Sequence, residues 1–381
     1  MNGFMTSRER MAAAMALDQP DRVPVMCQMS IGYMLLQAGA RPVTFWHSAE
    51  AYASGLVALQ RASGFDGILV SLYGHPPDWE ERIGRVETSA EGDIVHWKNG
   101  DRTLFPPDDL PVHVPALPVP APPLATFNPD GIPARLDYFP VSQGLEFRID
   151  AGHLEDIFRR VRAAAGPDIS LHGEVTSPFD YFLHFFGFEK ALLGLRDEPG
   201  RARELLQRFT DGVVQLAEEQ ASLGLDAVKI SSPFAGAGFI SPADYRSFVL
   251  PFERQVAAAV RRRGVAVYLH TCGDIHDRLE LMAEAGISGL ECLDPPPLGR
   301  VDLADAKRRV GKRLFIKGNL DPVNVLLRED IGRVREAARR ALKAGMPGGG
   351  YILSTACAVA PHTPGENVAV LRDVAEEFGR Y

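Results

Sequence analysis

The sequence of 381 residues predicts an α/β fold, a single (β/α)8 TIM barrel with a Pro-rich insertion after its second strand. Eight short runs of apolar and β-branched residues predict the strands. From the third run onward, longer stretches with helical periodicity separate the runs, which is typical of parallel βαβ units. We expect one domain, residues 1–381, because barrels with insertions commonly exceed ~250 residues without dividing.

The expected strands are, in chain order, residues 22–26, 67–72, 168–174, 227–232, 266–272, 289–293, 314–318 and 350–355. The clearest helices are expected at 188–223, 242–263, 275–285 and 331–344. Three helix starts carry capping residues: Thr6 with Glu9 and Thr363 with Glu366 have capping-box spacing, and Ser241 precedes Pro242.

The insertion is expected at about residues 91–148. This segment shows no amphipathic helix and contains Pro115, Pro118, Pro120, Pro122 and Pro123. Asn99-Gly100 favours the tight turn of a β-hairpin. We expect a hairpin and an extended loop between the second strand and its helix. The aromatic residues of the insertion either cover a ligand or pack the insertion onto the barrel; they are Trp97, Phe105, Phe127, Tyr138 and Phe139.

Composition excludes several classes of protein. A net charge of −8 argues against a nucleic-acid partner, which requires a dense Lys/Arg surface. No apolar run reaches the ~18–20 residues of a membrane span, so we expect no membrane partner. Four cysteines are too few for a disulfide scaffold, and a reduced, cytoplasmic protein is expected.

The strongest local signal is the segment Tyr-Leu-His-Thr-Cys-Gly-Asp at 268–274. Residues two apart on a strand share one face, so His270 and Cys272 point to the same side at the carboxyl end of the fifth strand. In a barrel this end faces the active site. Imidazole and thiolate are ligands that zinc prefers.

A third candidate ligand, Cys357, follows the eighth strand at the same rim. Three converging ligands with one position open are typical of catalytic zinc. The spacing alone leaves open that Cys357 is a small buried apolar residue. Cys27 and Cys292 are interpreted as core residues.

Further polar residues stand where other strands end, the position from which barrel residues commonly contact a ligand. Glu174 and Asp294 are the candidates for catalysis. Each of these residues is otherwise a helix cap or a loop hydrogen bonder. The candidates for substrate binding are His172, Ser231, Asn319 and Ser354.

These residues resemble the uroporphyrinogen decarboxylase superfamily. The matching stretches lie within residues 8–25, 240–251, 270–273, 317–322 and 354–367. The resemblance covers the N-terminal strand and the chain from about residue 171 onward, and the insertion has no counterpart in it.

The superfamily contains a metal-free branch and a metal-dependent branch. The metal-free decarboxylases hold substrate carboxylates with an Arg-rich Met-Arg-Gln-Ala-Gly-Arg motif. The corresponding residues 34–40 here read Met-Leu-Leu-Gln-Ala-Gly-Ala, which lacks both bidentate arginines. The other branch, cobalamin-linked methyltransferases, has a zinc motif that His270, Cys272 and Cys357 reproduce.

The resemblance therefore implies a Zn²⁺-dependent methyltransferase. It would move a methyl group between a small donor or thiol acceptor and a corrinoid (cobalamin) carried by a separate corrinoid protein. Glu174 would be a fourth ligand that substrate displaces, or a group that orients His270 or the substrate. Two alternatives stay open: a metal-free decarboxylase-like lyase, and a non-catalytic barrel that binds a tetrapyrrole or corrinoid.

Overall fold

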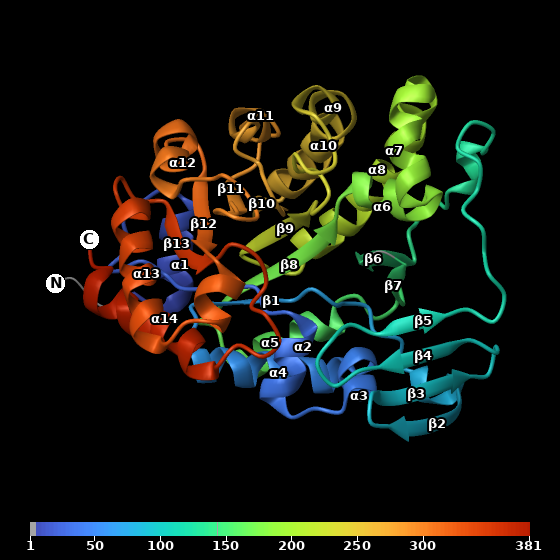
Figure 1. Cartoon of the computed structure of the whole chain (residues 1–381), viewed down its shortest axis with the longest axis horizontal. Coiled ribbons are helices and arrows are strands. Elements are labelled where there is room, and N and C mark those ends of the chain that lie inside the picture. The colour runs from blue at the N-terminus through green and yellow to red at the C-terminus, as the bar shows by residue number, and fades with distance from the viewer. Residues whose placement is uncertain (1–4, 143) are drawn as a thin grey trace.

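The computed structural model describes residues 5–142 and 144–381. Within these residues, a curled sheet of seven parallel strands forms the centre of the molecule (Figure 1). Its strands follow one another in chain order: β1 (Gly67–Leu69), β8 (Ser170–Thr176), β9 (Ala227–Ser231), β10 (Ala266–Thr271), β11 (Gly289–Cys292), β12 (Phe315–Leu320) and β13 (Tyr351–Thr355). The predicted α/β class with sequential parallel strands is confirmed.

Helices surround this sheet, and the main apolar core lies between the two layers (Figure 1). In the N-terminal part they are α1 (Ser7–Met15), α2 (Ile31–Ala38), α3 (Pro42–His47), α4 (Ala49–Ser63) and α5 (Asp156–Ala165). After β8 they are α6 (Pro178–Phe186), α7 (Phe188–Asp197), α8 (Pro199–Ala221), α9 (Pro242–Phe248), α10 (Leu250–Arg262), α11 (Leu279–Ala283), α12 (Leu303–Val310), α13 (Ile331–Gly345) and α14 (Gly365–Phe378). Within the described ranges, no helix combines the length and hydropathy needed to cross a bilayer.

The expected first strand, 22–26, is an extended segment with isolated bridges rather than a strand. Val25 bridges to Leu353 in β13, and the Val25 carbonyl accepts the Asp66 N–H at 2.8 Å. Pro24 accounts for the difference, since it has no N–H to donate to a ladder. The segment lies beside both β13 and the start of β1, and the strand count is seven where eight were expected.

Helix α1 covers the amino end of the sheet. Its residues Met11, Ala14 and Met15 form a second buried cluster with strand side chains such as Tyr268 and Phe315. The carboxyl ends of the strands are therefore the open end of the sheet.

The insertion follows β1, as expected, and precedes α5. It contains an antiparallel sheet of β2 (Ile83–Ser89), β3 (Gly92–Trp97), β4 (Arg102–Phe105) and β5 (Val112–Val114), and a hairpin of β6 (Tyr138–Ser142) and β7 (Leu145–Arg148). Figure 1 shows this sheet to one side of the parallel sheet. The predicted hairpin around Asn99-Gly100 is confirmed by β3 and β4. The sheet begins at Ile83, before the expected start at residue 91.

Helix boundaries agree with the capping residues at two of three starts. Thr6 and Glu9 form a capping box, and Ser241 accepts the Asp244 N–H. The capping box expected from Thr363 is wrong, because α14 begins one residue later and has Pro364 at its N-cap. The helix expected at 188–223 is divided between α7 and α8, where Pro199 begins the second helix.

Candidate metal centre

Three candidate zinc ligands come together at the carboxyl end of the sheet. His270 lies in β10, Cys272 directly follows that strand, and Cys357 follows β13. His270 Nε2 lies 3.3 Å from Cys272 Sγ, and Cys272 Sγ lies 3.7 Å from Cys357 Sγ. The three donor atoms all lie within 4.8 Å of one another. The curled sheet thus joins residues far apart in sequence.

This spacing fits a single zinc ion. Tetrahedral Zn²⁺, with Zn–S of ~2.3 Å and Zn–N of ~2.0 Å, places two sulfurs ~3.8 Å apart and nitrogen and sulfur ~3.5 Å apart. The 3.7 Å and 3.3 Å separations are close to these values. One nitrogen and two sulfurs leave a fourth position for a substrate atom, as in catalytic zinc sites.

Glu291 fixes the orientation of the His270 ring. His270 Nδ1 lies 2.9 Å from Glu291 Oε2, which leaves Nε2 for the side of the sulfurs. Lys317 of β12 also donates to this buried carboxylate. Burial favours the neutral acid, but Lys317, Lys229 and His270 hold the pKa of Glu291 well below its usual range, so the group is ionised. A carboxylate behind a metal-binding histidine fixes its tautomer and raises its basicity.

A network of buried charges continues from Glu291 into the interior. Lys229 Nζ lies 3.9 Å from Glu291 Oε2 and 3.1 Å from Glu174 Oε2, and it donates to Gln28 Oε1 at 2.9 Å. Burial opposes the charge on Lys229, but Glu174 and Glu291 raise its pKa. The two ammonium groups of Lys229 and Lys317 balance the two carboxylates of Glu174 and Glu291, as a buried ionic network requires.

Glu291, Lys229 and Lys317 are not among the site residues predicted from the sequence. Each stands within an otherwise apolar strand, and a buried charge is costly unless it is paired. A charged residue inside an apolar run that predicts a buried strand was therefore the sequence feature that could have identified them. Glu174 accepts from Ser71 Oγ at 2.5 Å, and among the described residues Glu291, not Glu174, contacts the His270 ring.

The surroundings of the cysteines favour one thiolate. The neighbouring thiols of Cys272 and Cys292, together with His270, lower the pKa of Cys357 well below its usual value against the effect of burial. Burial disfavours charge on His270, but the Cys272 and Cys357 sulfurs and Glu291 raise its pKa well above its usual value. Cys357 is thus stabilised as the thiolate, the form that binds metal. Burial and the neighbouring thiols raise the pKa of Cys292, which remains neutral.

The loop after β10 is held against Asp294. Gly273 has a φ of +75°, and its N–H donates to Asp294 Oδ2 at 2.6 Å. A Cβ on Gly236 would lie 2.6 Å from the carbonyl oxygen of Cys272, so glycine permits the two loops to approach. Asp294 is buried, and its Oδ1 has no hydrogen-bond partner in the described part of the chain. Burial and the nearby Cys357 raise the pKa of Asp294.

Two of the expected substrate-binding residues lie near the metal cluster. Ser231 ends β9 and is the register partner of His270. Ser354 lies in β13, and its buried Oγ has no partner among the described residues. Both are at the carboxyl half of their strands.

The other two expected substrate-binding residues have partners within the fold. Asn319 Nδ2 donates to the Leu293 carbonyl at 3.0 Å and so supports the loop after β11. His172 is fully buried, and its Nδ1 lies 3.1 Å from the Tyr268 hydroxyl, in the layer that α1 covers. Burial and Lys317 lower the pKa of His172 to about 4, so its ring is neutral.

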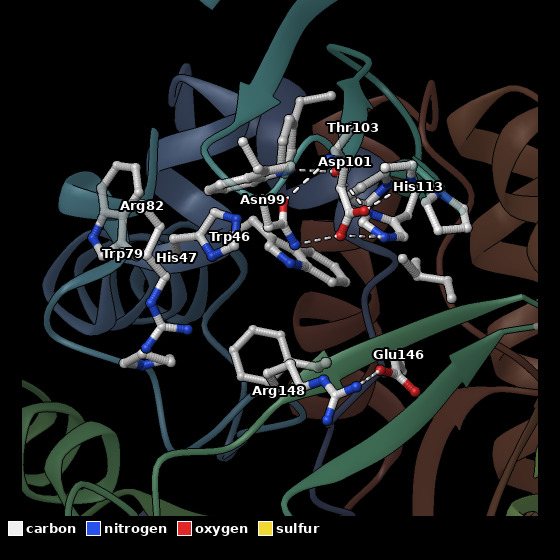
Figure 2. A pocket seen from close by; sticks show the side chains of 18 of the residues that line it. Trp46, His47, Trp79, Arg82, Asn99, Asp101, Thr103, His113, Glu146 and Arg148 are labelled. Atoms are coloured by element: carbon white, nitrogen blue, oxygen red, sulfur yellow. Dashed lines mark hydrogen bonds and ion pairs between the residues drawn. The ribbon is translucent and has the colours of Figure 1, made fainter. Parts of the chain in front are cut away.

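A large cavity of about 1060 Å³ lies between the insertion sheet and the β6–β7 hairpin (Figure 2). None of the three candidate metal ligands is among its described lining residues. A second cavity of about 270 Å³ shares Gly144 and His184 with it, and reaches Thr176 and Ser231 at the ends of β8 and β9. The two cavities therefore share part of their lining, and among the described residues only the lining of the second reaches the rim of the sheet.

Comparison with known proteins adds sequence relatives. The chain is 26% identical over 218 residues to the methylcobamide:CoM methyltransferase MtaA of Methanosarcina barkeri, a match that covers 57% of this chain and 61% of the relative. It is 33% identical over 189 residues to a uroporphyrinogen decarboxylase of Thioalkalivibrio sulfidiphilus, covering 49% of this chain and 51% of the relative. The chain thus spans about three fifths or less of the length of these relatives.

The fold has a full-length counterpart. A solved methyltransferase from Methanosarcina mazei superposes with a TM-score of 0.73 at 21% identity, covering 98% of this chain and 99% of that one. The family model of uroporphyrinogen decarboxylase (URO-D) matches residues 136–378, more than half of the sequence. The chain therefore belongs to the uroporphyrinogen decarboxylase family.

Proposed function

We propose that this protein is a zinc-dependent methyltransferase that moves a methyl group between a small substrate or thiol and a corrinoid carried by a separate protein. The observation that carries the proposal is the convergence of His270 Nε2 with the sulfurs of Cys272 and Cys357. The similarity to a named methylcobamide:CoM methyltransferase supports the reaction class.

The residues have separate roles in this proposal. His270, Cys272 and Cys357 would hold the metal, and Glu291 orients His270. Zinc bound there would supply a Lewis acid that keeps a substrate thiol deprotonated or polarises a methyl donor. Asp294, with an unpartnered Oδ1 and a raised pKa, is suited to hold a proton beside the reacting group.

The remaining predicted site residues complete the substrate site in this proposal. Ser231 and Ser354 would contact the substrate, and Asn319 would act through the loop that it supports. Glu174 would set the charge of Lys229 and so the field behind the metal ligands. His172 would contribute from deeper in the interior.

The partner would approach the carboxyl end of the sheet, since α1 covers the amino end. We propose one domain in which segment 22–26 takes the eighth strand position and closes the barrel. The free thiols of Cys272 and Cys357 suit a reducing compartment such as the cytoplasm.

The metal-free decarboxylase alternative is less well supported. A polycarboxylate substrate requires bidentate arginines, and residues 34–40 supply none. In α2, Met34 and Leu35 are buried in the core instead. A binding barrel without catalysis would tolerate the loss of Cys272 or Cys357.

The test combines elemental analysis with methyl transfer between methylated or reduced cobalamin and a set of thiols and methyl donors. Cys272→Ala and Cys357→Ala should lose zinc and turnover while retaining the circular dichroism spectrum. Cys27→Ala, at a buried cysteine of the core, is the matched control and should retain both. Full activity of zinc-free Cys272→Ala would overturn the proposal.

A further inference from the structure

The large cavity has aromatic walls. All three tryptophans of the chain line it: Trp46, Trp79 and Trp97. His47 stacks on Trp79, with ring centroids 5.4 Å apart, and meets Trp97 edge-on at 5.3 Å. In Figure 2, Trp46, His47 and Trp79 lie along one side of the cavity. Such a surface favours a planar ring, which gains stacking and edge-to-face contacts as well as burial.

The His47 ring adds no charge to this wall. Burial, together with the neighbouring His75 and Arg82, lowers the pKa of His47 to about 3. Its Nε2 is buried without a hydrogen-bond partner among the described residues. The aromatic wall is therefore neutral and carries one polar atom that the protein leaves unpaired.

The charged groups around the cavity are largely paired within the protein. Arg82 binds Asp78 at 2.7 Å, and Arg148 binds Glu146 at 2.7 Å (Figure 2). His113 Nε2 lies 3.6 Å from Asp101. The two further charged lining groups, Glu81 and Lys98, are opposite in sign. This arrangement does not require a ligand of high net charge.

Hydrogen-bond donors remain for a ligand. Trp97 Nε1 donates to Thr103 Oγ1 at 2.8 Å, and it is the only one of the three indole nitrogens with a partner in the described part of the chain. Trp46 and Trp79 line the same cavity. Oxygen atoms at the edge of a planar ligand would accept from such donors.

The rim of the cavity exposes apolar side chains. Leu117 is 79% exposed and Val119 is 87% exposed, and both line the cavity. They stand between prolines, in a segment without helix or strand. A ligand with an apolar body would cover this surface, which otherwise lies in water.

A second cavity adjoins the large one. It shares Gly144 and His184 with the large cavity, and its lining includes Ser231, the register partner of His270. A volume of about 1060 Å³ admits a ligand larger than one ring.

We propose that this cavity binds an uncharged, planar aromatic molecule with oxygen substituents. The proposal rests on the residues of the cavity and is independent of the proposed function.

Binding is measured by calorimetry and by quenching of tryptophan fluorescence. The probes are 4-methoxyphenol and 4-(4-methoxyphenyl)phenol, with 4-methoxycyclohexanol as the saturated counterpart. We expect both aromatic probes to bind and quench, the two-ring probe more tightly, and the saturated compound to bind at least about fivefold more weakly than 4-methoxyphenol. Equal affinity for the aromatic and saturated compounds would overturn the aromatic assignment.

Two variants of cavity residues test whether the probes bind in this cavity. Trp79→Leu and Leu117→Ser should each weaken the two-ring probe about tenfold or more, because each removes part of the apolar surface that the probe covers. Phe378→Leu is the matched control: this aromatic side chain is 37% exposed at the end of α14 and does not line the cavity. An equal affinity in all three variants would show that the probes bind elsewhere.

The same titration on Cys272→Ala separates this inference from the proposed function. Since the cavity contains no candidate metal ligand, the zinc-free variant should bind the probes as well as the parent protein does. Probe binding without methyl transfer from any donor would refute the proposed function and leave the binding site standing. Methyl transfer from other donors without probe binding would refute the inference alone.

Discussion

At the scale of single residues, Glu291 is the group on which the candidate centre depends most. One buried carboxylate contacts His270 Nδ1, accepts from Lys317 and lies near Lys229. It therefore couples the orientation of a candidate metal ligand to the charge balance of the interior.

Replacing Glu291 by Gln should weaken zinc binding about tenfold to a hundredfold, because the amide no longer raises the basicity of His270. It should also lower the free energy of unfolding by about 3 kcal/mol, since two buried ammonium groups lose their shared counterion. Zinc affinity is measured by competition with a chelator, and stability by chemical denaturation.

Glu253→Gln is the control for this variant. Glu253 is an equally buried carboxyl, but it accepts from the Tyr245 hydroxyl at 2.6 Å and lies outside the charge network. Its zinc affinity should equal that of the parent protein. Identical zinc affinity in Glu291→Gln would contradict the orienting role.

The positions of the three candidate ligands could be predicted from the sequence, but the partner of His270 could not. The faces of His270 and Cys272 follow from strand alternation, and the meeting with Cys357 follows from the order of parallel strands. The partner of His270 does not follow from either rule. Glu174 and Glu291 are both acidic residues of strands in the parallel sheet, and only the register of neighbouring strands brings the second to the imidazole.

At the scale of elements, Asp66 ties the N-terminal segment to the sheet. Its fully buried carboxylate accepts from Ser7 Oγ at 2.8 Å, Arg10 at 2.7 Å, Arg22 at 2.9 Å and the Val25 N–H at 2.8 Å. Helix α1 and segment 22–26 therefore share one anchor beside β1.

Replacing Asp66 by Asn should lower the free energy of unfolding by about 3 kcal/mol, because Arg10 and Arg22 lose a buried counterion. The measurement is urea denaturation followed by circular dichroism. Asp78→Asn, in an exposed pair with Arg82, should change stability by no more than about 0.5 kcal/mol. Equal effects of the two substitutions would mean that the anchor adds no more than a surface ion pair.

Asp180 in helix α6 makes the free energy of unfolding depend on pH. Burial, countered by the hydrogen bond with Ser177, raises the pKa of Asp180 to about 8. The folded state therefore keeps this proton at pH values where the unfolded chain has lost it. The contribution of Asp180 to stability is complete below the unfolded pKa of about 4 and is lost as the pH rises toward 8.

Asp180→Asn should remove this loss, because an amide resembles the neutral acid and cannot ionise. Relative to the parent protein, the variant should gain stability as the pH rises from about 5 to 8, in denaturation profiles. Asp156→Asn is the opposite control, since the hydrogen bond from His153 lowers the pKa of Asp156. Parallel profiles for parent and Asp180→Asn would contradict the raised pKa.

Element boundaries show where sequence patterns fail. The alternation of apolar runs located the strands from β8 onward, but Pro24 deprives segment 22–26 of a ladder donor and Pro199 restarts the helix after α7. Strand β2 was missed because its residues are mostly exposed, so no apolar alternation marks it. Tertiary pairing with β3, rather than burial, defines that strand.

At the scale of the whole molecule, stability should depend only in part on metal. A metal at 100 times its dissociation constant adds about 2.7 kcal/mol, a small part of the stabilisation from a core this extensive. Chelation should therefore lower the melting temperature of zinc-loaded protein by a few degrees and leave its circular dichroism unchanged.

The Cys272→Ala variant provides the reference for chelation. Its melting temperature should not respond to a chelator, because one of the two sulfur ligands is gone. A comparable decrease in this variant would place the stabilising metal elsewhere, and complete unfolding of the parent protein on chelation would make the metal structural.

The position of α1 has a further consequence for turnover. Because Met11, Ala14 and Met15 cover one end of the strands, a substrate of the proposed centre would have to enter and leave at the opposite end. If a corrinoid protein docks there, it blocks exchange of large molecules for as long as it stays. The residence time of that partner, rather than the height of the chemical barrier, would then set the upper limit on the number of cycles per second.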